Sequence, residues 1–351
     1  MAEGTLIEWA RHPATGLGAT WNIVTGCSVV SPGCTNCYAM RLAGTRLRSH
    51  PSRQGLTVAT KAGPVWNGET RFNEEWLIQP LGWKKPHGIF VAAHGDLFAE
   101  DVTDDQLDRI FAVMALTPQH IYFVLTKRPE RMREYLKTQN RWIDIAKQVM
   151  EITKQIVRCK VEFVYRDSDI GNRLPLPNVW LGVSVEDQSR ANARVPILLD
   201  TPAAIRFISA EPLLGPIDLT NLDDGLKDGV RLSFDALTGL AYDGHETISG
   251  IFGQPDPKLD WVIAGGESGP RAMHPDWAIS LRDQCADADV AFFFKQWGSW
   301  LPVTHDNGQI SYGRHQRHEF QDGLHAYKVS KREAGRELLG RTHDEYPEMR
   351  A

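Results

Sequence analysis

The chain has 351 residues, 42% hydrophobic and 24% charged, a composition typical of a water-soluble globular protein with a substantial core. Its formal net charge of −5 gives no overall attraction to nucleic acid, so any such binding would need a local basic surface. There is no apolar run of about eighteen residues, no signal peptide and only five cysteines, so we expect a cytoplasmic protein without a membrane segment.

The first predicted strand, residues 19–24, leads into a loop that holds three of the five cysteines. Cys27, Cys34 and Cys37 form a C-x6-C-x2-C pattern. Thiolates this close in sequence bind a metal ion, hold an iron–sulfur cluster or form a disulfide. Three ligands rather than four leave one coordination position open, as a catalytic centre requires. The loop therefore predicts a functional metal centre rather than a structural one.

Seven short apolar runs alternate with helical patterns along the chain. Most are β-branched or aromatic, which is typical of strands buried on both faces of a parallel sheet. They lie at residues 19–24, 88–93, 120–125, 179–185, 205–209, 261–264 and 291–295. About seven β/α alternations over roughly 280 residues predict an α/β fold, a partial or complete (β/α) TIM-like barrel. A doubly wound sheet is the alternative.

Two predicted helices have readable starts. Thr103 and Gln106 form a capping box before an apolar helical stripe, and Pro275 begins a helix with Trp277, Leu281 and Cys285 on one face. We expect the barrel to cover residues 1–300, with an inserted helix and strand at about 141–177 and a weakly structured surface excursion at about 220–258. A C-terminal extension over 301–351 is expected to pack on the barrel and to contain one short helix at 328–339.

Every predicted strand ends in polar or ligating residues, and the carboxyl ends of parallel strands meet at one rim. These ends are Thr25-Gly26-Cys27, His94-Gly95-Asp96, Thr126-Lys127-Arg128, Ser184-Val185-Glu186-Asp187, Ser209-Ala210-Glu211, Gly265-Gly266-Glu267 and Lys295-Gln296. Taken singly, each carboxylate could cap a helix, each basic pair could be solvated, and the two glycines could form a tight turn. Taken together, they predict an active-site rim.

Two other interpretations of these residues stay open. His94 could complete a Cys3His zinc site with the three cysteines, giving a zinc-binding interaction protein. Lys127, Arg128, Arg131 and Arg133 could instead grip phosphate groups, giving a nucleic-acid binding factor. Cys159 alternates with apolar residues and Cys285 shares a helical stripe with Trp277 and Leu281, so both are expected in the core.

Several segments together resemble the phage gene-product 37/68 family, an uncharacterised group related to radical S-adenosylmethionine (SAM) enzymes. The resemblance runs from Ile7 to about Pro347. In the first half of the chain it rests on W21-N-I-V-T-G-C, S31-P-G-C-T-N-C-Y-A-M, H94-G-D-L-F and L125-T-K-R-P-E-R-M. In the second half it rests on Pro177-Asn-Val-Trp-Leu-Gly-Val-Ser-Val-Glu186, S209-A-E-P-L-L-G-P, G265-G-E-S-G-P and F294-K-Q-W-G.

The resemblance implies a barrel of the radical SAM type with a [4Fe–4S] cluster on Cys27, Cys34 and Cys37. It also implies SAM on the fourth iron, an electron donor such as flavodoxin or ferredoxin, and an unknown substrate, with nucleic acid or a nucleotide among the classes left open. The roles expected are Asp96 for the SAM amine, Lys127 for its carboxylate, Tyr38 for adenine, Ser184 and Glu211 for the ribose, and Glu267 and Lys295 as catalytic residues on the substrate side. The pattern departs from the commonest C-x3-C-x2-C spacing, and its Gly-Gly-Glu follows the sixth predicted strand instead of the second.

Overall fold

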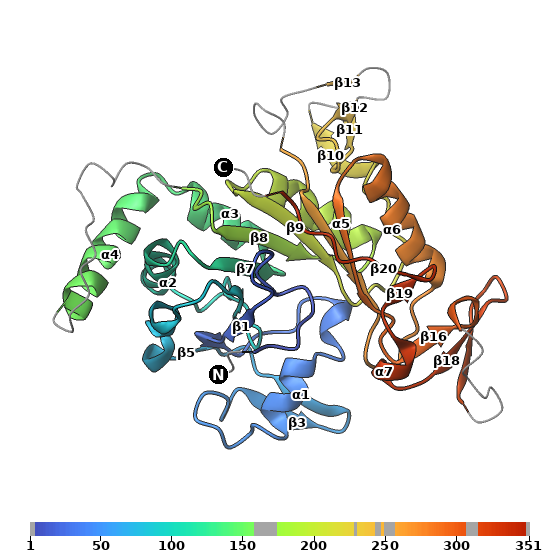
Figure 1. Ribbon diagram of the computed structural model, residues 1–351, viewed down its shortest axis with the longest axis horizontal. Coiled ribbons are helices and arrows are strands. Elements are labelled where there is room, and N and C mark those ends of the chain that lie inside the picture. The colour runs from blue at the N-terminus through green and yellow to red at the C-terminus, as the bar shows by residue number, and fades with distance from the viewer. Residues whose placement is uncertain are drawn as a thin grey trace. The chain divides into compact units, whose positions relative to one another are not determined.

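The computed structural model describes residues 4–157, 174–227, 230–242, 247–248, 257–306 and 315–348. Its largest sheet has seven strands in the order β1-β6-β7-β8-β9-β14-β15, and the pairs β1/β6, β6/β7, β9/β14 and β14/β15 are parallel (Figure 1). The strands are β1 (Gly18–Trp21), β6 (Gly88–Val91), β7 (Ile121–Thr126), β8 (Val179–Ser184), β9 (Ile205–Ala210), β14 (Trp261–Gly265) and β15 (Ala291–Gln296).

All seven predicted strands are present, and their burial explains their composition. All six residues of β8 and all five of β14 are buried, as expected for strands covered on both faces. The prediction for the first strand was too long, because β1 ends at Trp21 and Val24–Thr25 forms the separate strand β2, antiparallel to β5 (Arg71–Phe72). The side-chain amide of Asn73 donates to the carbonyls of Asn22 (3.0 Å) and Ile23 (3.2 Å) and so holds the chain between β1 and β2.

Helices occupy the connections between the parallel strands, so the α/β prediction is confirmed. They are α2 (Asp104–Leu116), α3 (Pro129–Lys137), α4 (Arg141–Val157), α5 (Gln188–Leu199) and α6 (Pro275–Asp287). The strand order is open, with β1 and β15 as its two ends. The connectivity is therefore that of a partial (β/α) barrel and not of a complete one.

The predicted helix starts are confirmed in atomic detail. The Thr103 hydroxyl accepts from the Gln106 amide (3.3 Å) and the Gln106 side chain accepts from the Thr103 amide (3.0 Å), which is the reciprocal capping box. In α6, Pro275 occupies the first turn, and Leu281 and Cys285 are fully buried.

The described chain divides into two compact units. The first unit comprises Met1–Gly182 with Thr201–Ala204, and the second comprises Val183–Asp200 with Ile205–Met349, so the division falls within β8. The buried aromatic residues Trp21, Tyr122 and Trp180 lie in the first unit, and Phe207, Trp261 and Phe293 lie in the second.

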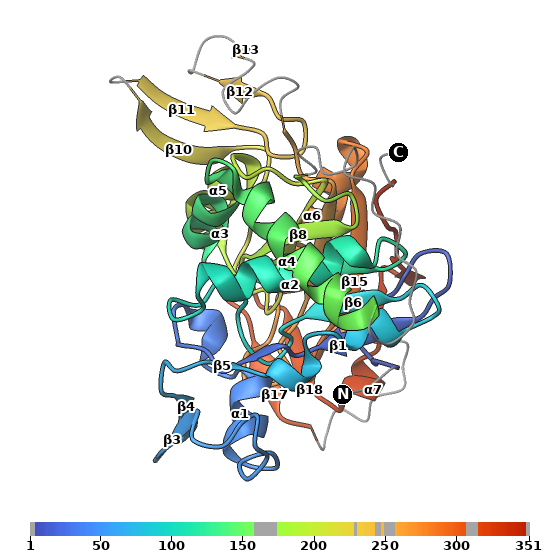
Figure 2. The same ribbon diagram turned by 90° about the vertical axis from the view of Figure 1, so that its left-hand side faces the viewer.

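Within the first unit, α2 and α4 lie side by side, and α1 (Tyr38–Gly44) lies beside the hairpin of β3 (Thr57–Thr60) and β4 (Gly63–Trp66) (Figure 2). The inserted helix predicted near residue 141 is α4. The strand predicted after it, with Cys159, lies outside the described residues. Short 3-10 turns complete this unit: η1 (Pro32–Cys34), η2 (Glu74–Trp76) and η3 (Gln79–Gly82).

Within the second unit, the excursion at 220–258 is more structured than predicted. It contains an antiparallel sheet of β10 (Leu222–Lys227), β11 (Val230–Phe234), β12 (Ala241–Tyr242) and β13 (Thr247–Ile248). The prediction was wrong because turn-forming residues also lie within a strand here: Asp223, Asp224 and Gly225 belong to β10, whose pairing with β11 shifts register at this point.

The C-terminal extension also differs from its prediction. It forms a sheet of β16 (Trp300–Pro302), β17 (Arg317–Glu319) and β18 (His325–Lys328), followed by β19 (Glu337–Leu338) and β20 (Arg341–Thr342), with the 3-10 turn η5 (Val303–His305) after β16. Within the helix expected at 328–339, only α7 (Lys331–Ala334) is helical. Gly335, with a φ of 68°, ends it. The last described segment lies against β15, since Phe294 donates to the His343 carbonyl at 2.9 Å.

Among the described residues, no helix combines the length and the apolar character that crossing a membrane requires.

Candidate functional site

The cysteine loop starts where β2 ends and runs into α1. Gly26 has a φ of 95°, and a Cβ atom there would meet the Glu69 carbonyl oxygen at 2.3 Å, so this position needs glycine. Cys27 follows it, Cys34 ends the turn η1, and Cys37 is the N-cap residue of α1. Each cysteine is therefore held by a different local element.

All three thiols are free, as is Cys285, the other cysteine in the described chain. Cys34 is buried, with its sulfur 3.7 Å from the Ser31 hydroxyl. Cys27 and Cys37 are half-buried and pack against a small core beneath α1, formed by Ala39, Met40, Ala43, Leu56 and Trp66. No disulfide competes with metal binding among the described cysteines.

The sulfur atoms are not arranged around one metal ion. The three do not all lie within 4.8 Å of one another, whereas sulfurs on a single zinc ion, each about 2.3 Å from the metal, cannot be farther apart than about 4.6 Å. In a cubane cluster each thiolate binds a different iron, which spreads the ligands more widely. In this arrangement the three sulfurs therefore do not form a single-ion zinc site.

His94 does not join the cysteines in a single-ion group. Its Nδ1 is 2.9 Å from Nη2 of Arg53, and burial, helped by the Arg53 charge, lowers the pKa of His94 to about 4. The imidazole is thus a neutral partner of an arginine, which counts against the Cys3His interpretation.

Arg128 links the cysteine loop to the ends of β6 and β7. One guanidinium nitrogen, Nη1, lies 3.6 Å from the Cys27 sulfur and 3.0 Å from Oδ2 of Asp96. Its other nitrogens donate to Glu100 (2.9 Å) and to the Ser28 hydroxyl. Burial alone would lower the pKa of Arg128, but Asp96, Cys27 and Glu100 raise it above its ordinary value. The group is therefore a fixed cation beside the first cysteine.

Asp96 holds this arginine in place. Its carboxylate is 5% exposed and accepts from the Phe98 amide (3.0 Å), the Thr126 hydroxyl (2.6 Å) and the Lys127 amide (3.0 Å), in addition to Arg128. Its two oxygens are therefore committed to four protein donors. This arrangement suits an orienting residue better than the predicted acceptor of the SAM amine.

The Cys27 thiol is held in its protonated form. Burial and the Asp96 charge raise its pKa to about 12, while Arg128 opposes the shift. In iron-free protein, we expect the rate at which iodoacetamide alkylates Cys27 to rise about tenfold per pH unit from about pH 7 to 10, because only the thiolate reacts. Peptide mass spectrometry would follow the rate, with free cysteine as the control that levels off. A plateau for Cys27 below about pH 10 would contradict the buried-thiol assignment.

Tyr38 and Lys127 lie in the same unit as the cysteines. The Tyr38 hydroxyl donates to the Ala93 carbonyl at 2.6 Å, its ring meets His94 edge-on at 5.7 Å, and 52% of the residue remains exposed. Lys127 donates its backbone amide to Asp96 and is half-buried. The structure thus brings Cys27, Asp96 and Arg128 into contact and leaves much of Tyr38 open to solvent.

The other predicted site residues lie in the second unit. Lys295 binds both carboxylate oxygens of Glu211 at 2.8 Å, and the Gln296 amide donates to the same carboxylate at 3.3 Å. Gln296 is 4% exposed, and its side-chain oxygen Oε1 has no hydrogen-bond partner among the described atoms. The sequence placed Gln296 at the predicted rim beside Lys295 but gave it no individual role.

Glu267 is paired with Arg271, four residues along the chain. The Arg271 Nε lies 3.1 Å from both carboxylate oxygens, and Glu267 is 7% exposed. The preceding Gly266 is needed for packing, because a Cβ atom there would meet the Trp297 carbonyl oxygen at 2.1 Å. The Gly-Gly turn is therefore explained by close approach of the protein's own backbone.

Three further strand-end residues have structural partners in the second unit. Ser184 is 5% exposed, and its carbonyl accepts from Arg194 at 2.7 Å. The fully buried Glu186 pairs with the same arginine at 3.0 Å. Asp187 caps α5 by accepting from the Arg190 amide at 3.0 Å, as the capping interpretation of such carboxylates predicts.

The basic cluster predicted to grip phosphate is largely neutralised. Arg128 is bound to Asp96 and Glu100, and Arg131 forms an ion pair with Asp104. Arg133 and Lys127 also have interaction partners. Arg128 and Arg131 therefore organise the protein instead of presenting free charge.

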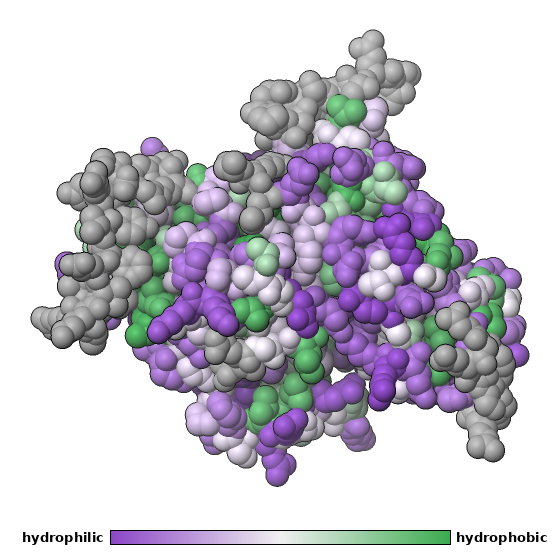
Figure 3. Space-filling view, viewed as in Figure 1, coloured by the Kyte–Doolittle hydropathy of each residue, from purple (hydrophilic) through white to green (hydrophobic). Residues whose placement is uncertain are grey.

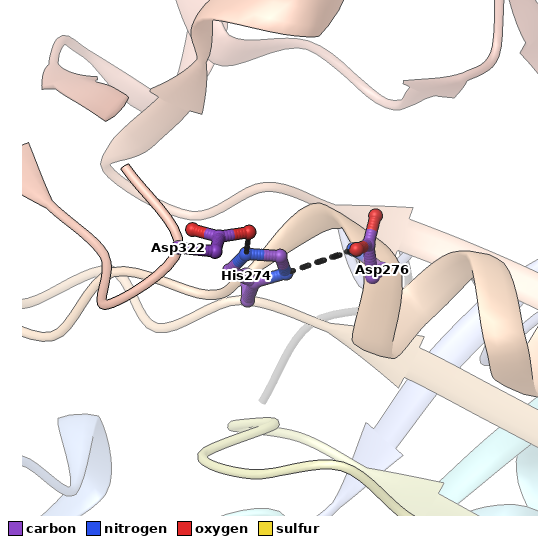
Figure 4. A group of neighbouring side chains, drawn as sticks. All are labelled: His274, Asp276 and Asp322. Atoms are coloured by element: carbon purple, nitrogen blue, oxygen red, sulfur yellow. Dashed lines mark hydrogen bonds and ion pairs between the residues drawn. The ribbon is translucent and has the colours of Figure 1, made fainter. Parts of the chain in front are cut away.

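One group in the described chain meets the distance requirement for a single metal ion: His274, Asp276 and Asp322 (Figure 4). Its hydrogen bonds give it another explanation. Nδ1 of His274 accepts from the Asp276 amide at 3.2 Å and so caps α6, and Nε2 lies 3.0 Å from Asp322. Figure 4 shows the two carboxylates at different ring nitrogens, whereas an imidazole presents one nitrogen to a metal.

A cavity of about 590 Å³ lies at the opposite end of the first-unit strands from the cysteine loop. It surrounds Gly18, which begins β1, and His87, which precedes β6. Its charged lining consists of Arg11, Lys84 and Lys85. Since this end of a parallel sheet rarely carries catalytic groups, the cavity is not assigned to the site.

Comparison with protein families gives one match. The model of a family described as "Protein of unknown function (DUF5131)" matches residues 4–347, nearly the whole chain. No curated protein and no solved structure matches the chain.

Proposed function

The chain belongs to the DUF5131 family, whose function is unknown, and we propose that it is a radical SAM enzyme. Cys27, Cys34 and Cys37 would hold a [4Fe–4S] cluster, and SAM would be the second cofactor. When bound, the cluster would supply the electron that cleaves the SAM sulfonium to give a 5′-deoxyadenosyl radical. The substrate and the final reaction are not specified by these residues.

The observation that carries the proposal is the state of the three thiols. All are free, all lie on the one loop that follows β2, and their sulfurs spread beyond the coordination sphere of one ion. The resemblance of the surrounding segments to a group related to radical SAM enzymes supports the same chemistry. The open, parallel α/β sheet is compatible with the partial barrel that this chemistry would use.

The chain's own residues would tune the cysteines. Arg128 donates toward the Cys27 sulfur, so its positive charge would stabilise the thiolate once the proton has left. Asp96 orients Arg128 through a buried ion pair. We therefore assign Asp96 to positioning, and propose Lys127 for the SAM carboxylate and the exposed Tyr38 ring for adenine.

For the predicted site residues of the second unit, we propose the roles expected from the sequence. Glu211 and Ser184 would bond the ribose, and Lys295 and Glu267 would face the substrate. Because Lys295 is bound to Glu211 and Glu267 to Arg271, a substrate would have to exchange hydrogen bonds with these pairs. A flavodoxin or ferredoxin would deliver the electron.

Anaerobic reconstitution with iron and sulfide tests the proposal directly. The expected product is a brown protein with the broad visible absorption of an iron–sulfur centre, which fades on exposure to air. A parallel sample offered zinc and iron together distinguishes the alternative site. A colourless protein that retains only zinc would refute the cluster assignment.

A further inference from the structure

The segment that follows the cysteine loop is strongly basic in an acidic chain. Residues 38–72, here named the basic lobe, contain six cations (Arg41, Arg46, Arg48, Arg53, Lys61 and Arg71) and one carboxylate, Glu69. Six positive charges against one negative give +5, and since the whole chain carries −5, the remainder carries −10. Positive charge is therefore concentrated in this lobe.

Four of the six cations are available to a partner. Arg41, Arg46, Arg48 and Lys61 are exposed, and within the described part of the chain none has a carboxylate partner. The other two serve the protein itself. Arg53 is buried against His94, and Arg71 donates to the Gln54 carbonyl at 2.8 Å. The free charge lies on α1, on the turn after it and on the β3–β4 turn.

The basic lobe is physically joined to the cysteine loop. Its helix and hairpin lie side by side (Figure 2), and they share the core of Ala39, Met40, Ala43, Leu56 and Trp66. Cys27 and Cys37 pack against that same core, and α1 begins at the residue after Cys37. Anything bound to the lobe would therefore lie beside the three cysteines.

Aromatic and apolar side chains are exposed at this junction. Val29, Val30 and Tyr38 are 47%, 43% and 52% exposed, the first two within the loop itself. On the face shown in Figure 3, hydrophobic residues occur in small groups among hydrophilic ones. Large continuous apolar patches mark protein-interaction sites, and three exposed apolar residues do not make one. A few exposed apolar groups beside free arginines instead suit bases and phosphates.

We propose that the basic lobe binds a single-stranded nucleic acid, with phosphates on Arg41, Arg46, Arg48 and Lys61 and bases against the exposed Val29 and Val30. Under the proposed function, this strand is the substrate presented to the cysteine loop. That role rests on the proposed function, but the binding itself does not. It goes beyond the rim cluster considered from sequence, whose Arg128 and Arg131 are neutralised by carboxylates.

Fluorescence anisotropy with labelled single-stranded DNA and RNA oligonucleotides, over a series of salt concentrations, tests this binding. The test variant is R46E/R48E/K61E. The matched control is R11E/K84E/K85E, which reverses three cations lining the distant cavity of the same unit. We expect the test variant to bind at least about tenfold more weakly and its salt slope to fall by about 2, at about 0.7 per phosphate contact. The control should stay within about twofold of wild type.

A neutral variant, R46Q/R48Q/K61Q, shows whether the loss in the charge-reversed protein comes from misfolding. Its affinity for the oligonucleotides should also fall below that of the wild type. Equal losses in the control and test variants, or no binding by the wild type, would overturn the proposal. So would an unchanged affinity for oligonucleotides together with lost binding of an acidic flavodoxin, which would make the lobe a protein-docking surface. Iron content is measured in parallel. The lobe variants should keep their cluster, so lost oligonucleotide binding with normal iron content concerns the basic lobe alone, whereas a wild type without iron would count against the proposed function.

Discussion

Anaerobically reconstituted Cys34→Ala protein is expected to hold almost no iron, whereas the wild type should hold about four iron atoms per chain. The loss should be nearly complete because a cluster with two thiolate ligands has no third anchor in this loop. Cys34 is buried at the end of η1, and Cys285, the other cysteine of the described chain, lies in α6. Iron and sulfide analysis of the desalted protein measures the effect.

Cys285→Ala is the matched control for this experiment. Cys285 is fully buried in α6, in the second unit, and burial raises the pKa of its thiol well above the ordinary value. Its substitution removes a core sulfur and should leave iron content unchanged. If Cys34→Ala keeps its iron while circular dichroism matches the wild type, the cysteine loop is not the cluster site.

Arg128→Met is expected to lower the free energy of unfolding by about 3–5 kcal/mol, because it leaves the Asp96 carboxylate buried without its cationic partner. The two side chains are 7% and 6% exposed and 3.0 Å apart, so water cannot replace the lost charge without rearrangement. Three other donors to Asp96 remain, which places the expected value toward the lower end. Urea unfolding monitored by tryptophan fluorescence provides the measurement.

Arg46→Met serves as the control, since Arg46 is exposed and has no ion-pair partner within the described chain. Its effect should stay within about 0.5 kcal/mol. Adding Asp96→Asn to Arg128→Met should recover part of the loss, because the unpaired buried charge is removed. A loss below about 1 kcal/mol for Arg128→Met alone would mean that the ion pair does not hold this part of the first unit together.

The sheet could be predicted from the sequence because strands buried on both faces leave a local signature. Each of the seven apolar runs corresponds to a strand, and the capping box at Thr103 marks the true start of α2. The open ends of the sheet could not be predicted, since closure depends on strand geometry and not on composition. The small sheet β10–β13 was missed because its short strands are rich in turn-forming residues.

The sequence predicted the residues of the candidate site, but only some of the contacts between them. The spacing of Cys27, Cys34 and Cys37 identified the loop, and the polar strand ends identified Asp96, Glu211 and Glu267. No local pattern revealed that Arg128 lies beside Cys27, because 101 residues separate them. The Glu211–Lys295 pair spans 84 residues and arises only when β9, β14 and β15 align in the sheet.

Production of 5′-deoxyadenosine from SAM tests the central proposal most directly. Reconstituted wild-type protein is incubated anaerobically with SAM and dithionite, with Cys34→Ala protein as the blank, and the nucleoside is quantified by mass spectrometry. We predict formation of 5′-deoxyadenosine that depends on both reductant and the three cysteines. If iron-loaded wild-type protein releases no more of it than the variant does, the chain is not a radical SAM enzyme.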